Sequence, residues 1–196
     1  MGKYHLELEK FFQTIVDEAE KAGTPRRKAI LLNYRDHAAL EYTDRWPEIF
    51  DPVRTVENPF YRVHWNTPEE VVYDGIDAVK EFYGAVKGDI FLTNEDQFLA
   101  VSDWGFASFT KINLFMGAET ARSMGHDARD DSAQYVFGTP AAMYWTYDER
   151  ERLISEFVYE IAPGTWGTVA EEDRITYEEI QGIVAQHLPP LPRAAA

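Results

Sequence analysis

Apolar and charged positions in the first part of the chain repeat with the period of a helix. Between residues 3 and 22, Leu6, Phe11 (or Leu8 and Phe12) and Ile15 recur at about helical spacing, with Glu and Lys among the positions between them. Gly23 interrupts this pattern. We therefore predict an amphipathic helix over residues 3–22 that ends at Gly23.

A second helix follows directly. Thr24 is a suitable N-cap, and Pro25 fits the first helical position. The helix is expected to reach Tyr42 or Trp46, and Pro47 then opens a short helical turn. One side of the second helix carries Ile30, Tyr34, His37, Ala38 and Glu41. This side is polar and aromatic as well as apolar, so it is a candidate wall of a binding site.

The next segment is predicted to be an extended arm. Residues 55–65 are rich in β-formers but contain Pro59, and alternation over residues 60–65 favours an edge strand. Asp74 then caps a helix predicted over residues 75–87, which has an apolar stripe.

In the second half the period changes from that of helices to that of strands. Tight turns at Trp104-Gly105 and at residues 148–150 join β-branched and aromatic runs into an antiparallel meander. The predicted strands are residues 98–103, 106–116, 141–147 and 152–161. The polar stretch between the second and third strands is a helix or loop, and it is a candidate lid. Thr176 and Glu179 have capping-box spacing, which predicts a final helix to about His187 before a tail.

Helices first and a curved antiparallel sheet second predict an α+β fold, in which the sheet wraps around the helices and leaves a conical cavity. We expect a single domain over residues 1–196. It is expected to comprise an N-terminal helical extension (1–23), a core (24–161), and a C-terminal helix and tail (162–196).

Composition and charge narrow the possible partners. The chain has 19 Lys and Arg against 34 Asp and Glu, a net charge of −15, which disfavours nucleic acid and anionic membranes. It has no cysteine, which excludes disulfides, thiolate metal sites and a cysteine nucleophile. The N-terminus has no apolar run like that of a signal peptide, so a cytoplasmic location is expected.

Three strings in the right order resemble the NTF2-like superfamily, which includes ketosteroid isomerase, scytalone dehydratase and the SnoaL-type polyketide cyclases. TVENP at 55–59 is similar to the arm after the family's second helix, and DGIDAVKEFYGAV at 74–86 to its third helix. TYDERERLISEFVYEI at 146–161 is similar to its last hairpin. The resemblance covers residues 26–161 and implies a cone-shaped α+β fold.

The resemblance also implies site residues. The tyrosine that donates to an oxyanion in ketosteroid isomerase corresponds to Tyr34, but the position of its general base is Asn58. An amide cannot accept a proton at neutral pH, and the second oxyanion donor falls near Met143, a thioether. The isomerase mechanism is therefore rejected as it stands, while the shared pocket is kept.

Other residues can supply the missing base. His37 lies one turn after Tyr34. His64 lies on the same face of the arm as Asn58 and Arg62 if the arm is a regular strand. Either histidine can act as base, with Tyr34 as donor and with Asn58 and Arg62 as positioning groups. This hypothesis requires Tyr34, His37 and His64 to converge in one cavity.

A carboxylate and four large apolar groups complete the candidate site. Glu156 lies between Ile154 and Val158 on an apolar face of the last strand, where burial would raise its pKa. The candidate substrate-binding residues are Phe60, Trp104, Met143 and Trp145. They would shape a slot for a flat molecule, although such residues are as often simply core.

These residues suit a cofactor-independent lyase that dehydrates, or cleaves by a retro-aldol step, a small hydroxylated aromatic or polycyclic molecule. Two alternatives stay open: a SnoaL-type cyclase or isomerase, and a small-molecule-binding module without catalysis. No cofactor and no metal site are expected, since His126, Asp127, Asp130 and Asp131 match no ligand spacing. By alternation, the outer face of the meander carries Phe109, Phe115, Phe157 and Tyr159, and such an aromatic patch predicts a homo-oligomer, a dimer or trimer.

Overall fold

The computed structural model describes residues 2–85 and 90–190. Its helices are α1 (Lys3–Lys21), α2 (Pro25–Glu41), α3 (Ile76–Ala85), α4 (Ala118–Ser123) and α5 (Tyr177–Val184), with 3-10 turns η1 (Trp46–Phe50), η2 (Glu171–Asp173) and η3 (Ala185–His187). Its strands are β1 (Thr55–His64), β2 (Val71–Asp74), β3 (Phe91–Ser102), β4 (Gly105–Met116), β5 (Tyr135–Tyr147), β6 (Leu153–Glu160) and β7 (Thr165–Thr168).

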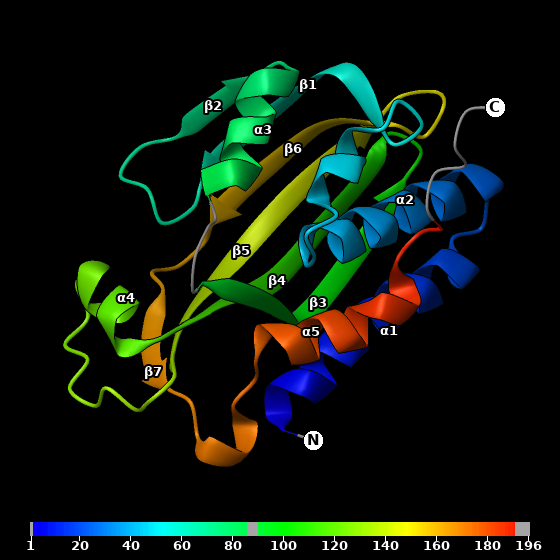
Figure 1. The fold of residues 1–196 in the computed structure, drawn as a ribbon. Coiled ribbons are helices and arrows are strands. Elements are labelled where there is room, and N and C mark those ends of the chain that lie inside the picture. The colour runs from blue at the N-terminus through cyan, green and yellow to red at the C-terminus, as the bar shows by residue number, and fades with distance from the viewer. Residues whose placement is uncertain (1, 86–89, 191–196) are drawn as a thin grey trace.

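The described strands form one sheet in the order β2-β1-β6-β5-β4-β3, with β7 paired to β5. Only β1 and β6 run parallel, and every other pair is antiparallel. Figure 1 shows that the long strands curve together, with α1, α2 and α5 lying on one side of them. The sheet curves around the helices without closing, which confirms the predicted α+β cone.

The two N-terminal helices form as their sequences predict. Thr24 accepts a hydrogen bond from the Arg27 backbone N–H at 3.2 Å, and Pro25 begins α2. The apolar stripe of α1 is buried, with Phe11 and Phe12 at the centre of the main core. Because α1 and α2 pack against each other and against the sheet, the inner side of α2 is held at a fixed distance from β3–β6.

Several elements differ from the sequence prediction. β3 begins at Phe91 and β5 at Tyr135, six or seven residues before the predicted starts, and β2 and β7 were not predicted. The early part of β3 is polar and contains a register shift between Glu95 and Phe98, which hides its alternation. The last two residues of the helix predicted over 75–87, and the tail from residue 191, lie outside the described residues.

The candidate lid is packed as part of the fold. Ala118, Ala121, Ala128 and Ala133 of the segment after β4 are buried in a small second core, which Tyr135 also joins. The ring of His126 stacks on that of Trp166 at 4.5 Å between centroids. No residue of this segment lines the cavity described below.

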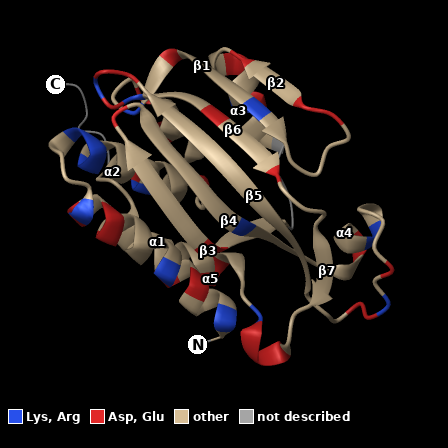
Figure 2. Ribbon diagram, turned by 180° about the vertical axis from the view of Figure 1, so that it is seen from behind, with Lys and Arg blue, Asp and Glu red and all other residues tan. Residues whose placement is uncertain are grey.

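Figure 2 shows that none of the described helices lies across β4, β5 and β6 on the opposite face of the sheet. β4 has one charged residue, Lys111, and β5 has none. Phe98, Phe109 and Tyr144 lie on this face with 66%, 37% and 46% of their surface exposed. Phe115 was also expected there, but it is fully buried because it packs edge-on against Tyr4 of α1 at 4.6 Å. None of the helices in the described ranges is long and apolar enough to cross a membrane.

Candidate functional site

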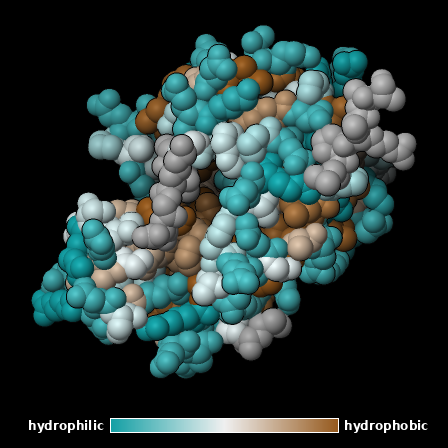
Figure 3. Space-filling model, in the orientation of Figure 1, coloured by the Kyte–Doolittle hydropathy of each residue, from teal (hydrophilic) through white to brown (hydrophobic). Residues whose placement is uncertain are grey.

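A cavity lies between α2 and the inner face of the sheet. Its apolar walls include Phe11, Val63, Leu92, Ile112, Met143 and Val158. The enclosed volume of the cavity is about 60 Å³. Together with the mouth, which is open to solvent, the empty space is about 570 Å³. Figure 3 shows hydrophobic residues in the recessed middle of this face of the molecule, with hydrophilic residues around them.

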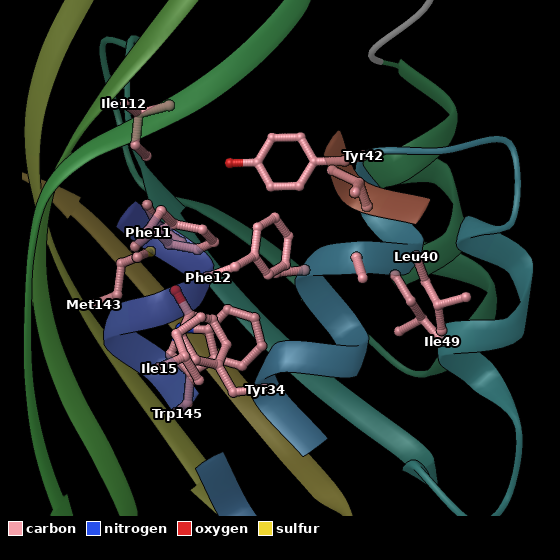
Figure 4. Packing of buried hydrophobic residues seen from close by; sticks show 14 of the residues in the cluster. Phe11, Phe12, Ile15, Tyr34, Leu40, Tyr42, Ile49, Ile112, Met143 and Trp145 are labelled. Carbon is pink, nitrogen blue, oxygen red and sulfur yellow. The ribbon is translucent and has the colours of Figure 1, made fainter. Parts of the chain in front are cut away.

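Tyr34 lines this cavity from the middle of α2, as the sequence predicts. Its ring packs on Phe106 at 4.5 Å and on Trp145 at 5.0 Å, and Figure 4 shows it beside Trp145. The Gln97 amide donates to the Tyr34 hydroxyl at 3.5 Å. Burial raises the pKa of Tyr34, so the phenol stays protonated and can donate a hydrogen bond into the cavity.

Two carboxyl groups line the same cavity. Glu156 projects inward from β6 and is only 6% exposed. Burial raises its pKa well above the usual value, the charge of Glu41 raises it further, and the Tyr83 hydroxyl opposes the shift. Glu41 is the last residue of α2 and is partly exposed, and burial raises its pKa to about 7. Burial therefore favours the protonated form of Glu156, while Glu41 is present in both its protonated and its ionised form near neutral pH.

Polar atoms in the cavity wall have no hydrogen-bond partner among the described residues. They are the Glu156 Oε2, Trp145 Nε1, Trp65 Nε1 and Asn94 Oδ1 atoms. An unpaired buried polar atom costs about 1–3 kcal/mol, so proteins seldom gather several in one place without a function. Trp145 and Glu156 are direct partners on β5 and β6, so their unpaired atoms belong to one patch of the wall.

His37 is buried behind this wall and does not line the cavity. Its Nε2 atom lies 2.7 Å from the Tyr83 hydroxyl, which lies 3.3 Å from the Tyr61 hydroxyl. The edge of the His37 ring meets Trp145 at 4.7 Å. Burial lowers the pKa of His37 to about 3, so the imidazole is neutral and held in a hydrogen-bonded core network.

The arm turns its other face to the cavity. Tyr61 and Val63 are buried, whereas Asn58 and Arg62 are exposed and Phe60 and His64 are half-buried. Arg62 pairs with Glu70 at 3.2 Å and lies over the Phe60 ring, on the outer face of the sheet. Alternation places Asn58, Phe60, Arg62 and His64 on one face of the arm, and this face was expected to point into the cavity. That placement is wrong, because alternation alone does not say which face of a strand is buried.

Tyr34, His37 and His64 therefore do not meet in one cavity. Of the expected substrate-binding residues, Met143 and Trp145 line it, but Trp104 is 47% exposed at the turn between β3 and β4. Glu41, Trp65 and Asn94 line the cavity but were not predicted as site residues, and Glu41 is the one with a titratable group. It lies on the same side of α2 as Tyr34 and Ala38, at helical spacing, and this was the available signal.

The cavity between helices and the concave face of a curved sheet defines a class of α+β cones, and the chain has the NTF2-like fold of that class. No protein-family model and no curated protein matches the sequence. A candidate polyketide cyclase of Xanthomonas campestris pv. campestris is similar in structure, with a TM-score of 0.51 and 8% identity over 68% of this chain and 91% of that one.

Two other solved structures are similar at lower TM-scores. Rv0760c of Mycobacterium tuberculosis has a TM-score of 0.45 and 10% identity, over 71% of this chain and 96% of that one. A phenazine biosynthesis-related protein of Pseudomonas aeruginosa has a TM-score of 0.40 and 10% identity, over 86% and 94%. Identities this low describe the fold alone, so the chemistry has to be argued from the residues of the cavity.

Proposed function

We propose that the protein is a cofactor-independent lyase that eliminates water, or a small aldehyde, from a small and mostly apolar hydroxylated molecule. The observation that carries this proposal is the pair of carboxyl groups, Glu41 and Glu156, in one cavity with the Tyr34 hydroxyl. Burial raises the pKa of both carboxyl groups, and the charge of Glu41 raises that of Glu156 further, so that Glu156 can serve as the acid and Glu41 as the base.

The roles follow from the protonation states. Ionised Glu41 takes a proton from carbon next to a carbonyl or similar group, and the Tyr34 hydroxyl donates to the oxygen on which charge develops. Protonated Glu156 gives its proton to the departing hydroxyl, which leaves as water. Glu41 ends protonated and Glu156 ionised, and a proton exchange through solvent restores both.

The size of the cavity limits the substrate. A dry cavity of about 150 Å³ is known to hold benzene. Since the enclosed volume here is about 60 Å³, the part of the substrate that reaches Tyr34 and Glu156 is smaller than a benzene ring. A larger aromatic or polycyclic molecule would have to extend into the mouth.

A panel of small β-hydroxy ketones and aryl hydroxy ketones tests the proposal. Loss of the mass of one water or of a small aldehyde identifies a lyase, and a new product of unchanged mass identifies a cyclase or isomerase. E41Q and E156Q should each lower kcat by about 10²–10⁴-fold. N58A on the outer face of the arm is the matched control. Turnover that survives both glutamine substitutions would remove the proposal, and binding without turnover would favour a binding module.

We also propose that the protein is a homo-oligomer that associates through the uncovered face of the sheet. An apolar patch around Phe98, Phe109 and Tyr144, with Phe157 half-buried beside them, supports this. Sedimentation showing only monomer at micromolar concentration would contradict it.

A further inference from the structure

The wall of the cavity has an unusual share of aromatic rings. They come from α1, α2, α3 and β5 and from the residues that directly follow α2 and β1: Phe11, Tyr34, Tyr42, Trp65, Phe82 and Trp145. Figure 4 shows the Tyr42 hydroxyl directed from α2 toward the strand that carries Ile112, with the Phe11 and Tyr34 rings on the same side of the helix. The face of each ring carries negative potential, which attracts a cation placed over it.

The same wall carries negative charge and no positive charge. Glu41 and Glu156 are its two ionisable carboxyl groups, and no Lys, Arg or His is among its lining residues in the described part of the chain. Cationic side chains elsewhere have other partners, for example Lys111 with Glu95 at 2.9 Å and Arg45 with Glu48 at 2.6 Å. The two carboxyl groups therefore have no cationic counterpart in the cavity.

Two further features favour positive charge at this place. The Glu156 Oε2 atom has no hydrogen-bond partner among the described residues, although only 6% of the surface of Glu156 is exposed. α2 ends at Glu41, so the negative end of its dipole lies at the wall of the cavity. A carboxyl group, a helix C-terminus and aromatic faces all lower the energy of a cation and raise that of an anion.

We propose that the cavity binds a small organic cation, a quaternary or protonated amine, whose positive charge lies among the aromatic rings and is balanced by the ionised form of Glu41. This inference rests on the proposed function for the location of the site, and it names the class of molecule that enters. The substrate then carries a cationic nitrogen in addition to its hydroxyl group.

The titratable groups around the two carboxyls decide how binding depends on pH. Those that face them from α2, β1, α3 and β5 are uncharged near neutrality and are Tyr34, His37, Tyr42, Tyr61, Tyr83 and Tyr147. Burial raises the pKa of each of the tyrosines and lowers that of His37. Glu41 is thus the group whose charge changes near pH 7.

Choline and its uncharged isostere 3,3-dimethylbutan-1-ol test the inference by calorimetric titration of the full chain. The two molecules share their shape and hydroxyl group and differ in charge, and choline stays charged at every pH. At about pH 8 choline should bind at least about tenfold more tightly. The difference should shrink as the pH falls to about 5.5, because Glu41 is then protonated.

Variants locate the charge. E41Q should abolish the preference for choline, whereas E172Q removes one charge from an exposed position in η2 and should leave it unchanged. This control separates the site from the general attraction of a chain with a net charge of −15. The pH series on the unaltered protein gives an independent readout if E41Q folds poorly.

Each outcome decides the question. Equal affinity for both molecules, weaker binding of choline, binding of neither, or a preference that E41Q leaves intact overturns the inference. Turnover of neutral hydroxy ketones with equal affinity for the two probes keeps the lyase and removes only the cation. Preference for choline with no turnover of any substrate keeps the cation site and removes the lyase.

Discussion

Glu41 links the chemistry of the cavity to the stability of the fold. Its pKa is about 7 in the folded protein and near 4.5 in an unfolded chain, so between these values the folded state binds a proton that the unfolded state has released. The contribution of Glu41 to stability is therefore complete below pH 4.5 and is lost as the pH rises through about 7. The loss is at most about 3 kcal/mol.

E41Q should lack this dependence. We expect the free energy of unfolding of E41Q, relative to the unaltered protein, to increase between about pH 4.5 and pH 8, as measured by urea unfolding at several pH values. The matched variant E172Q should change stability equally at every pH. A constant difference between E41Q and the unaltered protein would show that Glu41 titrates normally.

The contribution of His37 to stability depends on pH in the direction opposite to that of Glu41. Its pKa falls from 6.5 to about 3 on burial, so its contribution to stability is present above pH 6.5 and is lost as the pH falls toward 3. H37Q keeps a polar partner for Tyr83 but cannot be protonated. We expect H37Q to be less stable at neutral pH and to lose less stability on acidification than the unaltered protein, measured by thermal unfolding at about pH 7 and pH 4.5. An unchanged acid sensitivity would contradict this.

The sequence pointed to Tyr34 through the resemblance to the NTF2-like superfamily, to Met143 and Trp145 as large apolar groups of the predicted sheet, and to Glu156 as a carboxylate on an apolar strand face. It placed Asn58, Arg62 and His64 on the wrong side, since a strand has two faces and only tertiary packing chooses between them. A register shift between Thr55 and Phe60 adds to the ambiguity. Glu41 was missed as a site residue because a glutamate on a helix is ordinarily solvated.

The hairpin of β3 and β4 depends on one glycine. Gly105 has a φ of +146°, and a Cβ atom there would lie 1.9 Å from the Trp145 carbonyl oxygen. A side chain at this position would push β4 away from the part of β5 that carries Trp145. The turn therefore fixes one wall of the cavity as well as the sheet.

G105A should destabilise the protein by more than about 2 kcal/mol in urea unfolding, through backbone strain and the clash. G182A provides the control. Gly182 lies inside α5 with no atom near its would-be Cβ, so alanine there should stabilise by about 0.5–1 kcal/mol. Similar effects of both substitutions would show that the hairpin tolerates a side chain at Gly105.

At the level of elements, period and capping predicted most of the fold. The capping box at Thr176 and Glu179 marks the start of α5, and Thr24-Pro25 marks the start of α2. The short strands β2 and β7 were not predicted, because four residues contain too little alternation to show a period. Each pairs at one place with a longer strand, and that pairing is a tertiary contact that the local sequence does not encode.

The uncovered face of the sheet makes a prediction about the whole molecule. Phe98 and Phe109 are direct partners on β3 and β4 and are both exposed. F109E should shift the protein to monomer in sedimentation velocity, since a charge in an apolar interface is costly to bury. V53E makes the same type of change at a residue that is 70% exposed before β1, and it should leave the oligomer intact. A dimer or trimer that survives F109E would place the interface elsewhere.

The parallel pairing of β1 with β6 sets the order in which the molecule can fold. Thr55 pairs with Leu153, so these two residues, which are far apart in the sequence, must be brought together before β1 has a neighbour on that side. The β3–β4 and β5–β6 hairpins need only local closure and can form first. The arm carrying Tyr61 and Val63 then docks late, and the cavity is completed only when the rest of the sheet exists. Hydrogen exchange during refolding would show this as late protection of β1, and early protection there would refute it.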